Sequence, residues 1–331
     1  MKKISLFLTL SLLTIAAFAQ EKKTLVATAS MLSDMAKNIA GGMVNVECIV
    51  PIGGDPHLHE PTPKDAQMVN KADLIIMNGL TFEGWLTELI ENSGTKAQTV
   101  RVTEGIQPIE STEYKGSSDP HAWMDASLGL TYIKNIKDAL ITLDPDNADI
   151  FEFNYGVYKQ QLEDLDQYIK SEIQKIPAEK RVLITSHDAF QYYGRAYGIR
   201  LEAILGTSTD AEAQTSDIVR LNKVIRESKV PALFVESTVN PKLLKQLATD
   251  NDIRIGGQLY ADSIGDDKSP ASSYIDMLKH NTDTIVAALT RTQESAKENI
   301  SEGGTGSSWW LYGIIGVLLI GGFVMMLRMQ N

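Results

Sequence analysis

The sequence predicts an α/β protein of two lobes, each a set of parallel-sheet βα units, joined by one long rigid helix and followed by a C-terminal transmembrane helix. Three observations predict it. Short β-branched runs alternate with helix-like patterns along most of the chain. One long stretch without proline interrupts that alternation near the middle. An uncharged apolar segment lies near the C-terminal end.

Composition limits the class of protein. The chain has 331 residues, 43% hydrophobic and 22% charged, which is enough for one large or two medium domains with real cores. Its formal net charge is −11. Contacts to phosphates need clustered Lys and Arg, so this balance argues against a nucleic-acid partner.

Residues 1–19 are predicted to be a secretory signal peptide. Lys2 and Lys3 precede an apolar run from Leu6 to Ala17, and Ala17-Phe18-Ala19 is a small-x-small cleavage site. The alternative is an uncleaved N-terminal anchor, but the run is too short to span a bilayer comfortably. The mature protein is therefore expected outside the cytoplasm.

The only cysteine is Cys48. It cannot form an internal disulfide. It also lies far from the signal junction, so it offers no acylation site for a lipid anchor. We expect it to be a small buried hydrophobe.

Each lobe is expected to contain about four strands, in residues 20–144 for the N-terminal lobe and 178–293 for the C-terminal lobe. The expected strands lie near Thr24–Ala29, Val44–Val50, Leu74–Asn78, Thr99–Val102, Val182–Thr185, Leu201–Leu205, Ala232–Val235 and Ile253–Gly256. Expected helices between them include Met31–Ala40, Lys64–Lys71, Ser216–Ser228 and Pro241–Asp250. Strands that alternate with helices imply parallel sheets.

A linking helix is expected over residues 145–177. After Pro145 the chain contains no proline as far as Ile176, and only one glycine, Gly156. Apolar residues recur there at helical spacing; they are Tyr158, Leu162, Leu165, Ile169 and Ile173. A helix of this length would act as a stiff spine between the lobes rather than a flexible hinge.

The C-terminal part is expected to anchor the protein. Residues 294–308 are rich in Gly and Ser and are expected to form a flexible tether. Residues 309–327 are uncharged and apolar, and as a helix they would span roughly 28 Å. Arg328 follows, which places the C-terminus in the cytoplasm and the lobes on the outer side of the cytoplasmic membrane.

Three of the five histidines follow expected strands. His57 follows the second strand, His121 lies in the loop after the fourth, and His187 directly follows the first strand of the C-terminal lobe; Asp262 follows the last strand. Ligands of open parallel sheets bind beyond the carboxyl ends of the strands. Three imidazoles and one carboxylate suit Zn²⁺, and Mn²⁺ if the carboxylate is bidentate. Each histidine taken singly is more often a hydrogen-bonded loop residue, so placement alone leaves both interpretations open.

Four segments closely resemble the zinc/manganese solute-binding family of ABC transporters, which includes the TroA-like proteins. The resemblance runs from about Thr24 to Arg291. Its motifs are Asp-Pro-His-x-x-Glu-Pro at 55–61, Asp-Pro-His-Ala-Trp-Met-Asp at 119–125, Ser-His-Asp-Ala-Phe at 186–190 and Leu-Tyr-Ala-Asp-Ser-Ile-Gly at 259–265.

The resemblance implies a metal site in the cleft between the lobes. The family's ligand positions fall on His57, His121, His187 and Asp262. The implied protein is a monomer that captures zinc, or manganese, as transported cargo and delivers it to an ABC permease. The resemblance also implies that Glu236 and the segment 209–212 support the cleft. The chain departs from the family in lacking an acylated cysteine and a His-rich loop.

The other polar candidates are expected to have lesser roles. In an extended loop His59 would point away from His57, and His280 is expected to be exposed. Asp125 and Asp188 are expected to hold loops or cap helices. Orienting an imidazole is the functional alternative for these two carboxylates.

Two other functions compete. A zinc hydrolase needs an open coordination position and a base, and we find no His-Glu-x-x-His helix. An adhesin is the second alternative, and it rests on the resemblance alone. For the ion, three imidazoles favour zinc over manganese. The resemblance points the same way, because manganese-dedicated relatives tend to have glutamate at the position of His187.

Overall fold

The N-terminal lobe is built on a parallel sheet of four strands in the order β2-β1-β3-β4. The strands are β1 (Thr24–Ala27), β2 (Asn45–Cys48), β3 (Leu74–Met77) and β4 (Gln98–Arg101). The two central strands are apolar and almost fully buried, whereas the edge strands are partly exposed. The structure is a computed structural model, and it describes residues 22–110, 118–210, 213–228 and 230–290.

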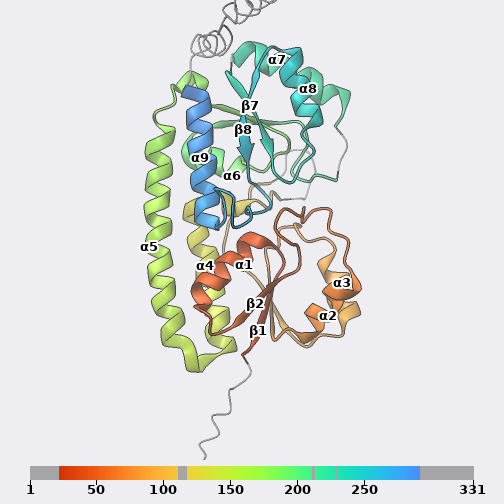
Figure 1. Cartoon of the computed structure of the whole chain (residues 1–331), viewed down its shortest axis with the longest axis vertical. Coiled ribbons are helices and arrows are strands. Elements are labelled where there is room, and N and C mark those ends of the chain that lie inside the picture. Colours follow the sequence, from red (N-terminus) through yellow and green to blue (C-terminus); the bar gives the residue numbers. More distant parts are fainter. Residues whose placement is uncertain (1–21, 111–117, 211–212, 229, 291–331) are drawn as a thin grey trace, which may run out of the picture.

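Three helices cover this sheet, α1 on one side and α2 with α3 on the other (Figure 1). They are α1 (Ser30–Ala40), α2 (Pro63–Lys71) and α3 (Leu86–Ser93). In α1 the residues Met31, Leu32, Met35 and Ile39 are buried at the spacing of one helical face. Thr62 begins α2 through a reciprocal capping box with Asp65.

The C-terminal lobe contains two parallel strand pairs. Strand β5 (Val182–Thr185) pairs with β6 (Arg200–Ala203), and β7 (Ala232–Glu236) pairs with β8 (Arg254–Leu259). The helices of this lobe are α6 (Gln191–Tyr197), α7 (Thr215–Ser228), α8 (Lys242–Asp250) and α9 (Tyr274–Thr290). The expected two-lobed α/β fold with parallel strands is therefore confirmed, although these four strands form two small sheets.

Helices α4 (Ala126–Leu143) and α5 (Ala148–Ile173) lie side by side along one flank, and α5 runs past both lobes (Figure 1). The expected apolar stripe of α5 is buried. The helix has 26 residues, fewer than expected, because residues Pro145–Asn147 form a 3₁₀ turn before it. 3₁₀ turns of the same length also occur at Ala122–Met124 and Ala178–Lys180.

One hydrophobic core connects the lobes. Leu25 of β1, Ile133 of α4, Leu162 of α5, Phe234 of β7 and Leu278 of α9 belong to the same buried cluster. Close-packed interiors resist deformation. The two lobes are thus held by a continuous core as well as by the α5 spine.

The expected C-terminal transmembrane helix is not part of the described fold. Within the described ranges, no helix is long and apolar enough to cross a bilayer. The longest described helices, α4 and α5, carry several charged residues each, including Lys134, Lys137 and Asp138 in α4. The span expected at 309–327, like the signal peptide at 1–19 and the tether at 294–308, lies outside the described residues.

Candidate metal centre

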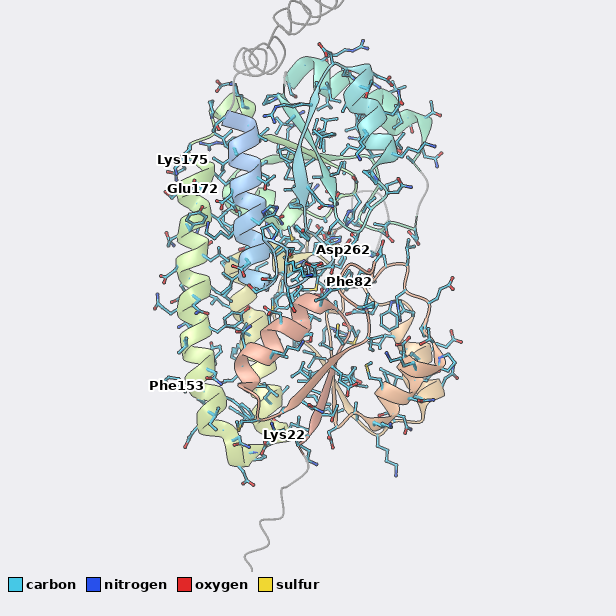
Figure 2. The ribbon with its side chains drawn as sticks, viewed as in Figure 1. Lys22, Phe82, Phe153, Glu172, Lys175 and Asp262 are labelled. Atoms are coloured by element: carbon cyan, nitrogen blue, oxygen red, sulfur yellow. The ribbon has the colours of Figure 1, made fainter. Side chains whose placement is uncertain are left out.

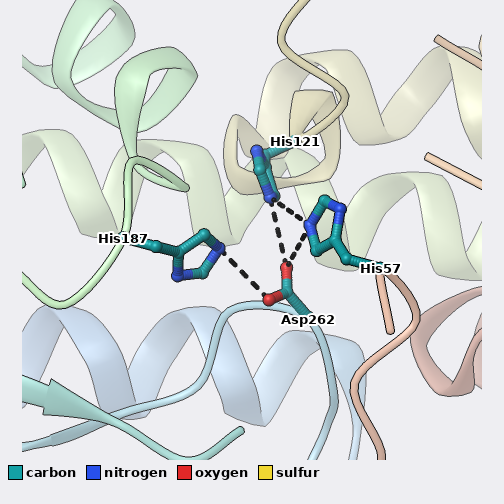
Figure 3. A group of neighbouring side chains, drawn as sticks. All are labelled: His57, His121, His187 and Asp262. Carbon is teal, nitrogen blue, oxygen red and sulfur yellow. Dashed lines mark hydrogen bonds and ion pairs between the residues drawn. The ribbon is translucent and has the colours of Figure 1, made fainter. Parts of the chain in front are cut away.

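Four side chains meet between the two lobes (Figure 3). His57, His121, His187 and Asp262 each offer one ligand atom, and these atoms all lie within 4.8 Å of one another. Figure 2 shows Asp262 and the neighbouring Phe82 at the junction of the lobes. The residues that the sequence singled out as candidates are therefore brought together by the fold.

Each of the four follows a strand. His57 lies in the loop after β2 and His187 two residues after β5, while Asp262 follows β8. His121 lies in the loop after β4 and directly precedes the 3₁₀ turn at Ala122–Met124. The carboxyl ends of the strands of both lobes therefore face the same place, as expected for a ligand site of parallel sheets.

The ligand atoms converge on one point. The two carboxylate oxygens of Asp262 lie 3.2 Å from His121 Nε2 and 3.2 Å from His187 Nε2. His57 Nε2 lies 3.3 Å from His121 Nε2 and 3.9 Å from Asp262 Oδ1. All three imidazoles thus present Nε2 to the centre, and the Asp262 carboxylate faces all of them (Figure 3).

The cluster is buried. His121, His187 and Asp262 have no exposed surface, and the side chain of His57 is 4% exposed. No described residue other than the histidines offers a hydrogen bond to the Asp262 oxygens, which lie 3.2 Å from the Nε2 atoms of His121 and His187. A buried carboxylate is costly unless a positive charge lies beside it, and here that charge is either the protonated imidazoles or a bound metal ion.

Two carboxylates hold the outer nitrogens of the buried imidazoles. Asp119 Oδ1 lies 2.7 Å from His121 Nδ1, and Glu236 Oε2 lies 2.6 Å from His187 Nδ1. A carboxylate on one ring nitrogen orients the imidazole and makes the other nitrogen a better metal ligand. The carboxylates thus aim both Nε2 atoms at the centre.

Asp119 was not among the residues predicted for this role. Its signal was available in the Asp-Pro-His sequence, because an Asp side chain readily accepts a bond from the backbone two residues later. His121 N donates to Asp119 Oδ1 at 2.9 Å, and His57 N donates to Asp55 Oδ1 at 2.9 Å. The two Asp-Pro-His segments make the same turn.

An aromatic wall borders the site. The Phe82 ring packs edge-on against the His57 ring, with 4.9 Å between the ring centroids. The centroid of the Trp123 ring lies 4.9 Å from that of Phe82 and 5.2 Å from that of His121. Phe82 follows Leu80 and Thr81, which adopt left-handed backbone conformations. Buried Glu83 holds this turn by accepting from the backbone of Asn78 and Gly79. Sequence patterns gave no sign of these supports.

The surroundings of the four side chains shift their pKa values in different directions. Burial lowers the pKa of His57 to about 3. Burial also opposes charge on His121, but Asp119 and Asp262 outweigh it and raise its pKa to about 9. Despite burial, Glu236 and Asp262 raise the pKa of His187 well above its usual value. The imidazoles in turn hold the pKa of Asp262 well below its usual value, against the effect of burial.

The remaining candidates lie outside the cluster. His59 Nε2 lies 3.3 Å from Asp65. His280, which was expected to be exposed, is half-buried beside the Gln258 carbonyl and the Tyr260 ring. Asp125 caps α4 by accepting from Ser127 N. Asp188 accepts from the Gln191 side chain, as expected for a residue that holds a loop.

Known proteins resemble most of the chain. The family model described as zinc-uptake complex component A, periplasmic (ZnuA), matches residues 25–288. The manganese ABC transporter substrate-binding lipoprotein PsaA of Streptococcus anginosus is 38% identical over 88% of this chain and 100% of its own length. The manganese-binding lipoprotein MntA of Halalkalibacterium halodurans is 38% identical over 81% of this chain and 88% of its own.

Solved structures agree with the two-lobed fold. The periplasmic zinc-binding protein TroA from Treponema pallidum superposes with a TM-score of 0.78 at 37% identity, covering 82% of this chain and 100% of that one. A manganese-bound periplasmic metal-binding protein from Candidatus Liberibacter asiaticus gives a TM-score of 0.75 at 32% identity, covering 81% and 100% of the two chains.

Proposed function

Because this chain belongs to the periplasmic zinc-uptake component A family of metal-binding proteins, we propose that it captures a divalent transition metal between its lobes and delivers it to an ABC importer. The ion is cargo rather than a resident cofactor. The proposed ligands are His57, His121, His187 and Asp262.

The convergence of three Nε2 atoms on one buried carboxylate carries this proposal. Water cannot compensate Asp262 there, because the side chain has no exposed surface. A divalent cation would take the place of the imidazole protons and bind the carboxylate and the three Nε2 atoms together. Binding would expel the protons that the imidazoles hold in the empty site.

The four protein ligands fit a site that captures a metal ion better than they fit a catalytic zinc site. A catalytic zinc site keeps a coordination position open for water and needs a nearby base. Here four protein ligands surround the centre, and the carboxylates of Asp119 and Glu236 are engaged with imidazoles. A hydrolase assay of the zinc-loaded chain that gave turnover would favour the competing zinc hydrolase.

We expect the site to bind zinc more tightly than manganese and to accept both ions. Three imidazoles and one carboxylate form a nitrogen-rich set, and manganese lies at the weak end of the Irving–Williams order. The relatives named above include manganese-binding and zinc-binding proteins. Both oxygens of Asp262 face the site, so bidentate binding could raise the coordination number for manganese.

The proposed partner is the permease of a metal ABC importer, and the proposed location is outside the cytoplasmic membrane. Both rest on the relatives, which are substrate-binding lipoproteins of metal ABC transporters or periplasmic proteins. The adhesin alternative receives no support, since these relatives are named for metal binding and transport.

Elemental analysis of the full chain, purified without added metal, tests the proposal. One zinc or manganese ion per chain is expected. Competition titration of the apo protein with both ions then tests the order of affinity. If the protein binds neither ion, the proposed function is refuted. If manganese displaces equimolar zinc, only the predicted preference for zinc over manganese is wrong.

A further inference from the structure

Thr209 joins the two lobes next to the candidate metal centre. It lies between β6 and α7 in the C-terminal lobe, and its hydroxyl donates to Asp55 Oδ2 of the N-terminal lobe at 2.6 Å. The two residues are 154 positions apart in the sequence. Their bond is therefore made only when the lobes are together.

Asp55 connects this bond to a proposed ligand. Its other oxygen, Oδ1, accepts from the backbone N–H of His57 at 2.9 Å. In the matching segment Asp119 Oδ1 makes the same backbone contact and also lies 2.7 Å from the imidazole of its own histidine, His121. Asp55 thus fixes the His57 loop from the backbone side, and Thr209 holds Asp55 in turn.

Other hydrogen bonds also join the lobes near the site. Trp123 Nε1 donates to the Ala261 carbonyl at 2.9 Å, and Ser263 Oγ accepts from Gly53 N at 2.7 Å. Trp123 and Ala261 have no exposed surface, whereas Asp55 and Thr209 are both partly exposed and Gly53 is exposed. Water can therefore compete for the Thr209–Asp55 bond more readily than for the Trp123–Ala261 bond.

A cavity gives access to the bond from one side. Asp55 and Thr209 line a largely apolar cavity of about 530 Å³, together with Ser186, the residue before His187. Leu58 and Leu243, which also line it, are 52% and 39% exposed. Solvent can therefore reach the Thr209–Asp55 bond without passing through the four proposed ligands.

We propose that Thr209 is a positioning residue whose bond to Asp55 holds the His57 loop against the C-terminal lobe and slows the release of the bound ion. This inference rests on the proposed function. His57 is the least buried of the four ligands, so the loop that carries it is the natural side from which the ion leaves. Thr209 acts through Asp55 and does not touch the ion.

Zinc release from the full chain tests the proposal. Thr209→Val keeps the shape of the side chain and removes the donor, and Thr209→Ala serves as a second such variant. The dissociation rate is measured with excess chelator. Release from either variant is expected to be roughly tenfold faster than from wild type, the effect of losing one hydrogen bond to a charged group. Thr209→Ser should restore slow release.

Thr249→Val is the matched control, because the Thr249 hydroxyl donates to the Lys245 carbonyl on the exposed side of α8. Its release rate should equal that of wild type. The apo proteins should melt at similar temperatures. Asp55→Ala should also speed release, and adding Thr209→Val to it should speed release no further, because both changes remove the same bond.

The outcomes separate the two hypotheses. If the wild-type protein binds neither zinc nor manganese, the proposed function itself is refuted. If wild type binds metal and the folded Thr209→Val and Thr209→Ala variants release it at the wild-type rate, the role of Thr209 is refuted alone. Independent effects of the Asp55 and Thr209 substitutions in the double variant would refute it as well.

Discussion

Glu236 holds His187 with both of its carboxylate oxygens. Oε1 accepts from the backbone N–H of His187 at 2.8 Å, and Oε2 lies 2.6 Å from the ring nitrogen Nδ1. Both residues are buried. One side chain at the end of β7 therefore fixes the backbone and the imidazole of a residue that follows β5.

This contact makes Glu236→Gln the sharpest test of the imidazole supports. The glutamine carbonyl oxygen can still accept from the His187 backbone, but its amide would place N–H donors against Nδ1 and favour the wrong tautomer. Zinc affinity, measured by chelator competition, is expected to fall about 10- to 100-fold. Glu202→Gln is the control, because Glu202 pairs with Arg220. Wild-type affinity in Glu236→Gln would show that the contact does not support the site.

Alanine substitution of the proposed ligands should have a graded result. His57→Ala, His121→Ala, His187→Ala and Asp262→Ala are each expected to weaken zinc binding severely, because each removes one of four donors. His59→Ala and His280→Ala should bind normally, since both side chains lie outside the cluster. Isothermal titration would check this. Any of the first four that keeps wild-type affinity is not a ligand.

Zinc binding at pH 7 should release about two protons per ion. The pKa of His121 is about 9 and that of His187 is also well above its usual value, so both imidazoles are charged in the empty site at pH 7. His57, with a pKa of about 3, is already neutral. Calorimetry in buffers of different ionisation enthalpy counts the protons.

The same pKa values set the direction of the pH dependence. Affinity should fall as the pH is lowered from 9 towards 7, because binding then requires more proton release. Imidazoles of ordinary pKa would give a decline only below about pH 6.5. A flat response between pH 9 and pH 7 would contradict the protonation states described above.

The stability of the apo protein should decline as the pH rises from 6.5 towards 9. The pKa of His121 in the folded state, about 9, exceeds its usual value of 6.5, so its contribution is complete below pH 6.5 and is lost as the pH rises through 9. Complete loss of this contribution lowers the free energy of unfolding by about 3 kcal/mol. The pKa of His57 is lowered instead, so its contribution is present above pH 6.5 and is lost as the pH falls towards 3.

Denaturant unfolding of the apo and zinc-loaded proteins over this pH range would measure the effect. The alkaline decline is expected in the apo protein. It should be absent in the zinc-loaded protein, whose imidazoles carry no exchangeable proton on Nε2. Equal unfolding free energies of the apo protein at pH 6.5 and pH 9 would argue against a charged His121.

Local sequence determined the strands, most helices and the four candidate ligands. The apolar run Leu74–Met77 and the apolar stripe of α5 are visible in the spacing of residues along the sequence. This spacing predicts the strand and the helix without knowledge of the fold. The motifs around His57, His121, His187 and Asp262 could likewise be recognised as short segments. Composition alone also suggested a C-terminal transmembrane helix, which the described fold does not contain.

Only the tertiary structure decided how these segments meet. The contacts of Glu236 with His187, of Thr209 with Asp55 and of Phe82 with His57 join residues 25 to 154 positions apart. No local period or spacing encodes such pairs, because they depend on which loops the packed lobes bring to one edge. The pKa values follow the same rule. His57 and His121 share the Asp-Pro-His sequence, yet burial leaves one neutral, while carboxylates that the fold places beside the other keep it charged.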